Sequence, residues 1–225
     1  MLELMPLLPD GRALRVLCLG AHCDDIEIGC GGTLLALQQV GIIGQIDWVV
    51  LSGSAARCAE TAEARERLVK EAARGELLFG DFEDGTMPAQ YREVKAFIEG
   101  LKAWPVPDMV FTHEREDRHQ DHRLVNEITW NTFRDQLVLE YEIPKWDGGL
   151  GQPNLYVPIA RKLGEQKIAA LLECFGSQAG RDWFTSDLFA GMLRLRGMEC
   201  RSESGWAEAF HARKLRFHAG GSSQS

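Results

Sequence analysis

The sequence predicts a single α/β domain of the Rossmann-like type, with a mostly parallel sheet and helices on both of its faces. Short apolar runs rich in β-branched residues and leucine alternate with segments that carry apolar residues at helical spacing, up to about residue 145. The chain has 225 residues, of which 45% are hydrophobic, so it is long enough to bury one full core. No internal repeat or linker indicates a second domain.

The individual elements follow from these runs in order. We expect buried strands at 15–22, 46–53, 107–113 and 137–143. Helices are expected between them at 27–41, 91–104 and 119–135, and at 58–80 with either Gly75 or Gly80 as the end of the helix. Beyond residue 145 the pattern loosens to a short extended piece at 156–159, helices at 160–178 and 182–197, and a last strand within 206–217. The domain is expected to span residues 1–219, with 220–225 as a disordered tail.

Composition excludes several classes of protein. The formal net charge of −8 argues against a nucleic-acid binder, which usually carries a basic stripe. No apolar run reaches the ~18 residues that span a bilayer, and the N-terminus, with Glu3, lacks the basic start of a signal peptide. The six cysteines show no paired spacing and are expected to be reduced thiols. These features predict a cytoplasmic protein, and a homo-oligomer is compatible with them.

Two polar clusters stand where two predicted strands end. His22-Cys23-Asp24-Asp25 directly follows the first strand, and the segment HEREDRHQDH, residues 113–122, follows the strand at 107–113. Ligands of open parallel sheets bind outside the carboxyl ends of the strands. Although they lie about 90 residues apart, the two clusters can therefore converge on one point.

The residue types in these clusters are those of a catalytic metal site. A catalytic zinc takes three His or carboxylate ligands and keeps one position open for water. His22, one of Asp24 and Asp25, and His122 could supply them, while His119, three residues before His122, shares its helical face. Either cluster alone could instead be a helix cap or a solvated surface, so the prediction depends on their occurring together.

These segments resemble the LmbE/PIG-L de-N-acetylase family. AHCDDIEIGCGGTL is similar to its AHPDD-x-E-x-G-x-GGT signature, and HEREDRHQDH to its HxxxDxHPDH segment. Asp84-Gly85, GEQKIAALLECFGSQ and GWAEAF resemble further family segments, so the resemblance extends over most of residues 15–215. Cys23 and Gln120 stand where the family has prolines. Neither position supplies a ligand or base in the family pattern, and Cys23 is expected to be a buried thiol.

The resemblance implies a zinc-dependent amide hydrolase and gives its site residues. The metal ligands would be His22, Asp25 and His122, with iron as an alternative to zinc because such His/carboxylate sites accept either ion. Asp24 would be the general base that activates water and later protonates the leaving amine.

Further roles follow from the same resemblance. His119 would stabilise the oxyanion, oriented by Asp121, a neighbouring carboxylate of the kind that favours a protonated histidine. Asp84 and either Arg65 or Arg67 would contact the sugar. Gln178, at the end of a helix, could contact the substrate or cap the helix.

The expected substrate is an N-acetylhexosamine within a larger glycoconjugate, which would yield acetate and a free amino sugar. An amidase acting on a thiol conjugate, a non-catalytic sugar- or nucleotide-binding module and a metal phosphoesterase are the alternatives. The last two are disfavoured because GxGxxG is missing and because two-metal sites need more carboxylate ligands. Gly29, Gly31 and Gly32 favour close packing of the first helix over a phosphate-binding turn. Trp183 could stack on a sugar ring or fill the core.

Overall fold

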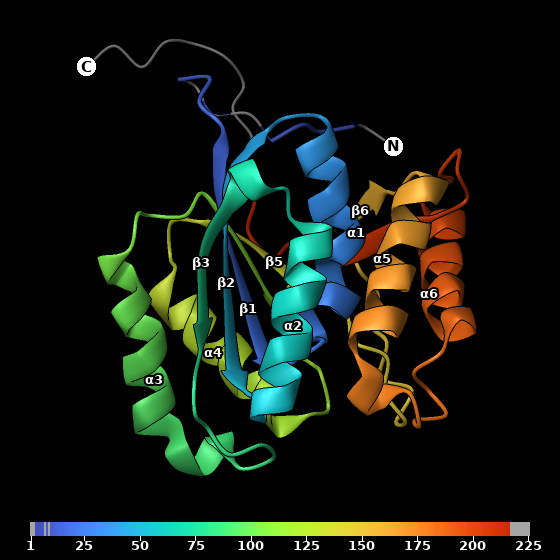
Figure 1. Ribbon diagram of the computed structural model, residues 1–225. Helices are drawn as coiled ribbons and strands as arrows, with labels where there is room; N and C mark the ends of the chain where they lie inside the picture. The colour runs from blue at the N-terminus through green and yellow to red at the C-terminus, as the bar shows by residue number, and fades with distance from the viewer. Residues whose placement is uncertain (1–2, 7, 9, 217–225) are drawn as a thin grey trace.

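A seven-stranded sheet forms the centre of the molecule, in the order β3-β2-β1-β4-β5-β7-β6 (Figure 1). The computed structural model describes residues 3–6, 8 and 10–216. Strands β1 to β5 run parallel, whereas β7 pairs antiparallel with β5 and β6 antiparallel with β7. The strands are β1 (Leu14–His22), β2 (Ile43–Ser52), β3 (Arg74–Phe79), β4 (Met109–His113), β5 (Leu137–Tyr141), β6 (Leu155–Pro158) and β7 (Ala207–His211). The predicted mostly parallel α/β sheet is confirmed.

Helices cover both faces of this sheet, as predicted. Figure 1 shows α1, α2 and α5 on one side and α3 and α4 on the other, while α6 packs against α5 and β7. The α-helices are α1 (Asp25–Gln39), α2 (Ala55–Leu68), α3 (Tyr91–Gly100), α4 (Gln120–Thr132), α5 (Arg161–Cys174) and α6 (Ser186–Glu199). Short 3-10 helices lie at η1 (Glu71–Ala73), η2 (Met87–Gln90), η3 (Leu101–Ala103) and η4 (Gly176–Gln178).

The central strands are buried on both faces and divide the core in two. Along β1, Val16 and Cys18 belong to the core under α1, α2 and α5, and Leu17 and Leu19 to the core under α3 and α4. Successive side chains of a strand point to opposite faces, so a strand covered on both sides reads as a continuous apolar run. This explains why these strands were recognisable in the sequence.

The predicted helix at 58–80 is wrong in its second half. Helix α2 ends at Leu68, Val69 is already extended, and Arg74–Phe79 forms the edge strand β3. Leu77 and Phe79 pair with Trp48 and Val50 of β2. The sheet edge offered by β2 overrides the helical composition of this segment, because strand preference depends mainly on packing against neighbours.

The glycines of α1 serve close packing, as the sequence favoured. A Cβ atom at Gly29 would lie 2.3 Å from the ring of Tyr141, and one at Gly32 would lie 2.9 Å from Glu208 Oε1. The helix can therefore approach β5 and β7 closely only because these positions carry no side chain.

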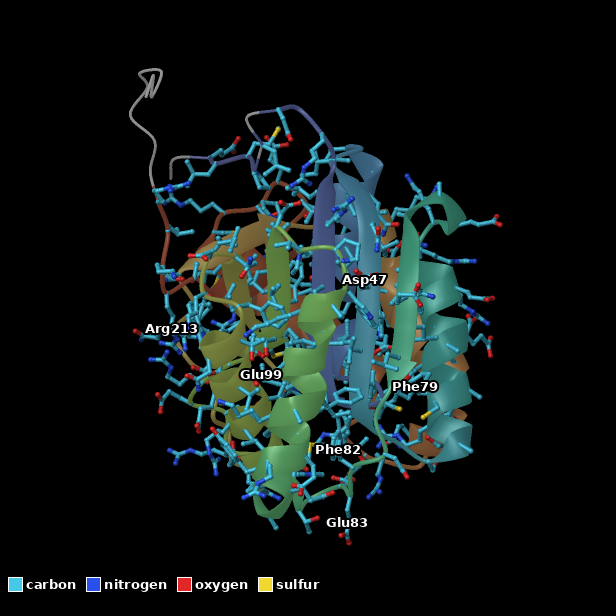
Figure 2. The ribbon with its side chains drawn as sticks, turned by 90° about the vertical axis from the view of Figure 1, so that its left-hand side faces the viewer. Asp47, Phe79, Phe82, Glu83, Glu99 and Arg213 are labelled. Atoms are coloured by element: carbon cyan, nitrogen blue, oxygen red, sulfur yellow. The ribbon has the colours of Figure 1, made fainter. Side chains whose placement is uncertain are left out.

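The strand order reverses between β1 and β4, and this reversal determines where a ligand-binding site is expected. Strands β2 and β3 continue to one side of β1, and β4 and β5 to the other. The connections leave on opposite faces, and in open parallel sheets ligands bind at such a reversal, outside the carboxyl ends of the strands. These ends lie at the bottom of Figure 1. Figure 2 follows one contributing segment from Phe79 past Phe82 to Glu83. The expected tail, 220–225, lies outside the described residues. Among the residues that the structure describes, no helix is long and apolar enough to cross a membrane.

Candidate active site

A cavity of about 640 Å³ opens at the carboxyl ends of the parallel strands. It collects residues from the end of β1, the first turn of α2, the loops after β3, β4 and β5, the start of α4 and the segments around η4. Its polar lining includes His22, Asp24, Asp25, Arg57, Asp84, His119, His122 and Gln178. The two clusters that are remote in the sequence therefore meet in one place.

The first cluster is held by a tight connection between β1 and α1. Asp24 adopts a left-handed conformation (φ 94°) that only a few non-glycine residues take. This reversal lets α1 begin directly after the strand, and Asp25 Oδ2 accepts a hydrogen bond of 2.6 Å from the backbone N–H of His22. The carboxylate of Asp25 is thereby fixed at a helix N-terminus, where negative charge is favoured.

Three side chains, His22, Asp25 and His122, bring four possible donor atoms together at the inner end of the cavity. His22 Nδ1 lies 3.1 Å from His122 Nε2. Asp25 Oδ2 lies 3.5 Å from His22 Nδ1, and Asp25 Oδ1 lies 3.5 Å from His122 Nε2. Donors around a tetrahedral ion with ligand distances of about 2.0–2.2 Å are roughly 3.3–3.6 Å apart. All three side chains are buried, and with one oxygen of Asp25 as the carboxylate they supply the types of ligand that a divalent cation takes.

Carboxylates hold the second nitrogen of each imidazole. His22 Nε2 lies 3.1 Å from Asp121 Oδ2 and 3.0 Å from Asp84 Oδ1. His122 Nδ1 lies 3.0 Å from Asp117 Oδ2. Metal-binding histidines usually donate their other N–H to such a carboxylate, which fixes the ring and makes the coordinating nitrogen more basic. Both rings are therefore arranged to present Nδ1 of His22 and Nε2 of His122 to a common point.

Asp117 links the second cluster together. Its carboxylate accepts hydrogen bonds from Lys145 Nζ (2.6 Å) and from the backbone N–H of His119 (2.7 Å), in addition to its contact with His122. Burial opposes ionisation of Asp117, but the hydrogen bond with His122 and the charge of Lys145 outweigh it and lower the pKa of this carboxyl. Asp117 is thus an ionised positioning group.

A fourth histidine lies beneath the cluster. His113, at the end of β4, is fully buried, and its ring stacks on that of His122 with centroids 3.7 Å apart. Its Nε2 accepts a hydrogen bond of 2.9 Å from the backbone N–H of Ala21. His113 therefore ties β4 to β1 and supports the His122 ring from below.

The inner end carries an excess of negative charge. Burial alone would lower the pKa of His22, but hydrogen bonds to Asp121, Asp25 and Asp84 raise it to about 11. The carboxylates thus strongly favour a positive charge at this imidazole. A bound cation would satisfy the same field, which agrees with the fit of the donor set.

Asp24 stands apart from this group and faces Arg57. Its carboxylate is buried and accepts a hydrogen bond of 2.8 Å from Arg57 Nη2, which also donates to the carbonyl of Cys23. Burial raises the pKa of Asp24 to about 7, although the charge of Arg57 favours the carboxylate. A carboxyl group with a pKa near neutrality can both accept and return a proton.

The Asp121 carboxylate does not hydrogen-bond to the His119 ring, contrary to the expectation that it orients this ring. The Asp121 carboxylate accepts from the backbone N–H groups of Gly85 (2.7 Å) and Met87 (3.1 Å) and contacts His22. Residues two apart at a helix start do not face each other. Only the backbone N–H of Asp121 reaches His119 Nδ1, at 3.3 Å. Burial and the charge of His22 lower the pKa of His119, so its neutral form, with the proton on Nε2, is favoured.

The structure brings only some of the expected sugar-contacting residues to the cavity. Asp84 and Gln178 line it. Arg65 instead donates to the carbonyl of Gly75, and Arg67 pairs with Glu173 and Glu63 on the surface. Neither arginine lines the cavity, because both lie two to three turns beyond the start of α2.

Arg57 is the arginine of α2 that lines the cavity, where we expected Arg65 or Arg67. It lies in the first turn of α2, shortly after the end of β2, and lines the cavity. Its position just beyond a strand end, like that of the two clusters, is a signal that could have identified it. Lys145, from the β5–β6 connection, was also missed, and its segment offered no comparable signal.

Cys23 is a buried thiol rather than a metal ligand. Its Sγ points toward the carbonyl of Ser52, at 3.7 Å. Burial raises the pKa of Cys23 to about 12, so the group stays protonated. A protonated thiol is a poor ligand, and the departure from the family's proline leaves the donor set unchanged.

The chain is similar to several known proteins. A curated relative, the uncharacterized deacetylase YaiS of Escherichia coli K12, is 27% identical over 164 residues, which cover 69% of this chain and 88% of the relative. The structure of N,N'-diacetylchitobiose deacetylase from Pyrococcus horikoshii matches with a TM-score of 0.68 at 20% identity, covering 88% of this chain and 83% of that one.

A structure with a different activity has the same fold. GalB, the 4-carboxy-2-hydroxymuconate hydratase from Pseudomonas putida KT2440, matches with a TM-score of 0.67 at 16% identity and covers 93% of this chain and all of its own. The fold alone therefore does not decide the reaction. The family model described as PIG-L, GlcNAc-PI de-N-acetylase, matches residues 17–133, just over half of the chain. The chain belongs to this deacetylase family.

Proposed function

We propose that this protein hydrolyses the acetamide of an N-acetylhexosamine within a glycoconjugate, releasing acetate and a free amino sugar. The observation that carries the proposal is the convergence of His22, Asp25 and His122, with the carboxyl group of Asp24 beside them. Membership of a deacetylase family supports the reaction class. The GlcNAc in the family description and the chitobiose deacetylase among the structural matches support an amino-sugar substrate.

The ligand set would be His22 Nδ1, His122 Nε2 and a carboxylate oxygen of Asp25. Zinc fits two imidazoles and one carboxylate, and iron(II) is the alternative. A divalent cation bound there would polarise the acetamide carbonyl and lower the pKa of a water molecule toward about 7. The residues of the chain provide the remaining steps.

Asp24 would accept the proton of the attacking water. Its pKa of about 7 suits this task, because a base near the working pH can take up a proton and return it. The water oxygen bonds to the carbonyl carbon, and the tetrahedral adduct then breaks its C–N bond. The proton held by Asp24 passes to the leaving nitrogen, so that acetate and an amine result. Arg57 keeps the Asp24 carboxylate in place throughout.

His119 would stabilise the oxyanion of the adduct. Because its Nδ1 accepts from the backbone, its Nε2–H is free to donate into the cavity. A neutral histidine donor in a partly buried site can stabilise developing negative charge without the cost of holding a second cation there. Asp84, Gln178 and Arg57 line the cavity around this point and would contact the sugar hydroxyl groups.

Acetate release from a panel of N-acetylated compounds tests the proposal. We expect release from N-acetylglucosamine conjugates that stops on addition of a chelator and returns on addition of zinc. An N-acetylated thiol conjugate and an N-acetylated amino acid serve as comparison amides. Acetate release only from these comparison amides would assign the protein to another class of amidase. No release from any compound would contradict the proposed reaction.

A further inference from the structure

The cavity extends well beyond the polar centre. Pockets for drug-sized ligands measure about 300–1,000 Å³, and this one, of about 640 Å³, holds more than an acetamide and its sugar ring. Besides the polar groups, it is lined by apolar side chains from two connections. These side chains, here called the tryptophan rim, are Ile143, Pro144 and Trp146 after β5, and Trp183 and Leu188 before and within α6.

Trp146 does not belong to the hydrophobic core. Its exposed fraction is 78%, the largest among the exposed large hydrophobic side chains of the described residues. An indole presents much apolar area with little conformational freedom, so exposed tryptophans at a cavity are typical of binding surfaces.

The turn that carries Trp146 is fixed to the polar centre. Lys145 Nζ donates to Asp117 Oδ2, the same atom that lies 3.0 Å from His122 Nδ1. The N–H of Gly148, at φ 65°, donates to the carbonyl of Lys145 at 3.2 Å, which closes a turn with Trp146 at its tip. Trp146 is therefore held at a defined place relative to the reacting centre.

Trp183 lines the same cavity from a second segment. Its ring packs edge to face against the buried Phe184, with centroids 5.4 Å apart. This contact fixes one side of the indole, and the residue still lines the cavity. Two indoles from separate connections thus line one cavity.

The charges near the rim do not favour an anion. Arg118 and Lys145 line the cavity together with Asp147 and Asp182, so the two signs balance. Lys145 is already paired with Asp117. Phosphate groups are usually bound by clusters of arginine or lysine that are not neutralised in this way. The rim therefore fits an uncharged group with a flat apolar face.

We propose that the tryptophan rim binds an uncharged ring attached to the N-acetylhexosamine, either a second sugar or an aryl group. The proposal rests on the proposed function, since it places the reacting acetamide at the polar centre. Both kinds of ring offer the flat C–H or π surface on which an indole stacks. The protein would then prefer two-ring conjugates to free sugars and to sugar phosphates.

Kinetics on four substrates test this specificity. We would measure kcat/KM for acetate release from N-acetylglucosamine, its β-linked N-acetylated disaccharide, an aryl β-N-acetylglucosaminide and N-acetylglucosamine 1-phosphate. Because a ring stacked on an indole adds binding that the free sugar lacks, we expect kcat/KM of at least one two-ring compound to exceed that of the free sugar by about tenfold. The better of the two identifies the ring as sugar or aryl. Equal values for all compounds, or a gain for the phosphate alone, would overturn the proposal.

Three matched variants locate the effect. Trp146→Leu and Trp183→Leu keep an apolar side chain but remove the flat face, and each should lower the two-ring to free-sugar ratio of kcat/KM at least threefold. Trp104→Leu, directly after η3 and not in the lining of this cavity, is the control that should leave this ratio unchanged. An unchanged ratio in both rim variants would contradict the proposal.

Binding measurements test the tryptophan rim independently of the proposed reaction. We would measure the Kd of each compound for the Asp24→Asn protein by calorimetry, with and without Trp146→Leu. Tighter binding of a two-ring compound, lost with Trp146→Leu, supports the rim even if no acetate is released. Equal affinity for all compounds overturns it, even if N-acetylglucosamine is hydrolysed.

Discussion

Asp24 is the residue on which the proposed chemistry depends most. Asp24→Asn keeps the size of the side chain and an oxygen for Arg57 but removes the proton acceptor. We expect kcat for acetate release to fall by about 10²–10⁴-fold, the usual contribution of a general base. Because Asp24 is not one of the three converging donors, zinc per chain, measured by elemental analysis, should stay at the wild-type value.

Asp187→Asn, on the first turn of α6, is the matched control for this substitution. It removes one carboxylate without touching the polar centre, so its kcat and metal content should equal those of the wild type. Wild-type turnover in Asp24→Asn would exclude Asp24 as the base. Loss of metal in that variant would show that it acts as a ligand instead.

At the level of single residues, the sequence predicted which side chains meet but not all of their contacts. His22, Asp25 and His122 could be placed together because strand ends in a parallel sheet share one edge. Arg57 lines the cavity and Arg65 does not, because α2 begins at Ala55 and a shift of two turns moves a side chain about 10 Å along a helix. The partner of Asp121 could not be foreseen, because it is set by the loop after β3.

A buried ion pair joins three elements behind the site. Lys167 Nζ of α5 donates to Glu208 Oε1 of β7 (2.5 Å) and to the carbonyl of Ile28 in α1 (2.6 Å). Glu208 also accepts from the N–H groups of Gly32 and Thr33 in α1. These contacts satisfy charges and backbone groups that would otherwise be unpaired.

Lys167→Met should therefore lower the free energy of unfolding by about 3–5 kcal/mol, because it leaves the Glu208 carboxylate buried without its cation. Urea denaturation at neutral pH measures this change. Lys162→Met, at an exposed position of the same helix, should change stability by less than about 0.5 kcal/mol. Equal effects of the two substitutions would show that the buried pair does not stabilise the fold.

Among the elements, the central strands and most helices could be read from periodicity, whereas the sheet edges could not. Strands β1, β2 and β4 are buried runs with a clear pattern. Strand β3 was mistaken for helix because Arg74–Phe79 continues a helical composition and becomes a strand only through pairing with β2. The antiparallel placement of β6 and β7 likewise depends on partners remote in the chain.

On the scale of the whole molecule, the fold assembles a site that no single segment contains. The two imidazoles come from positions 22 and 122, on either side of the point where the strand order reverses. The first turn of α2 supplies Arg57, and the loops after β3 and β5 supply Asp84 and Lys145. A hydratase has the same fold, so the sheet alone does not set the reaction.

Titration of metal-free protein with zinc tests the central claim most directly. Protein stripped with a chelator would receive increasing zinc while acetate release from the preferred N-acetylglucosamine conjugate is followed. We predict no turnover before addition and a linear rise that ends at one zinc per chain, with His122→Gln failing to respond. Full turnover of the stripped protein, or an equal response of His122→Gln, would contradict the account.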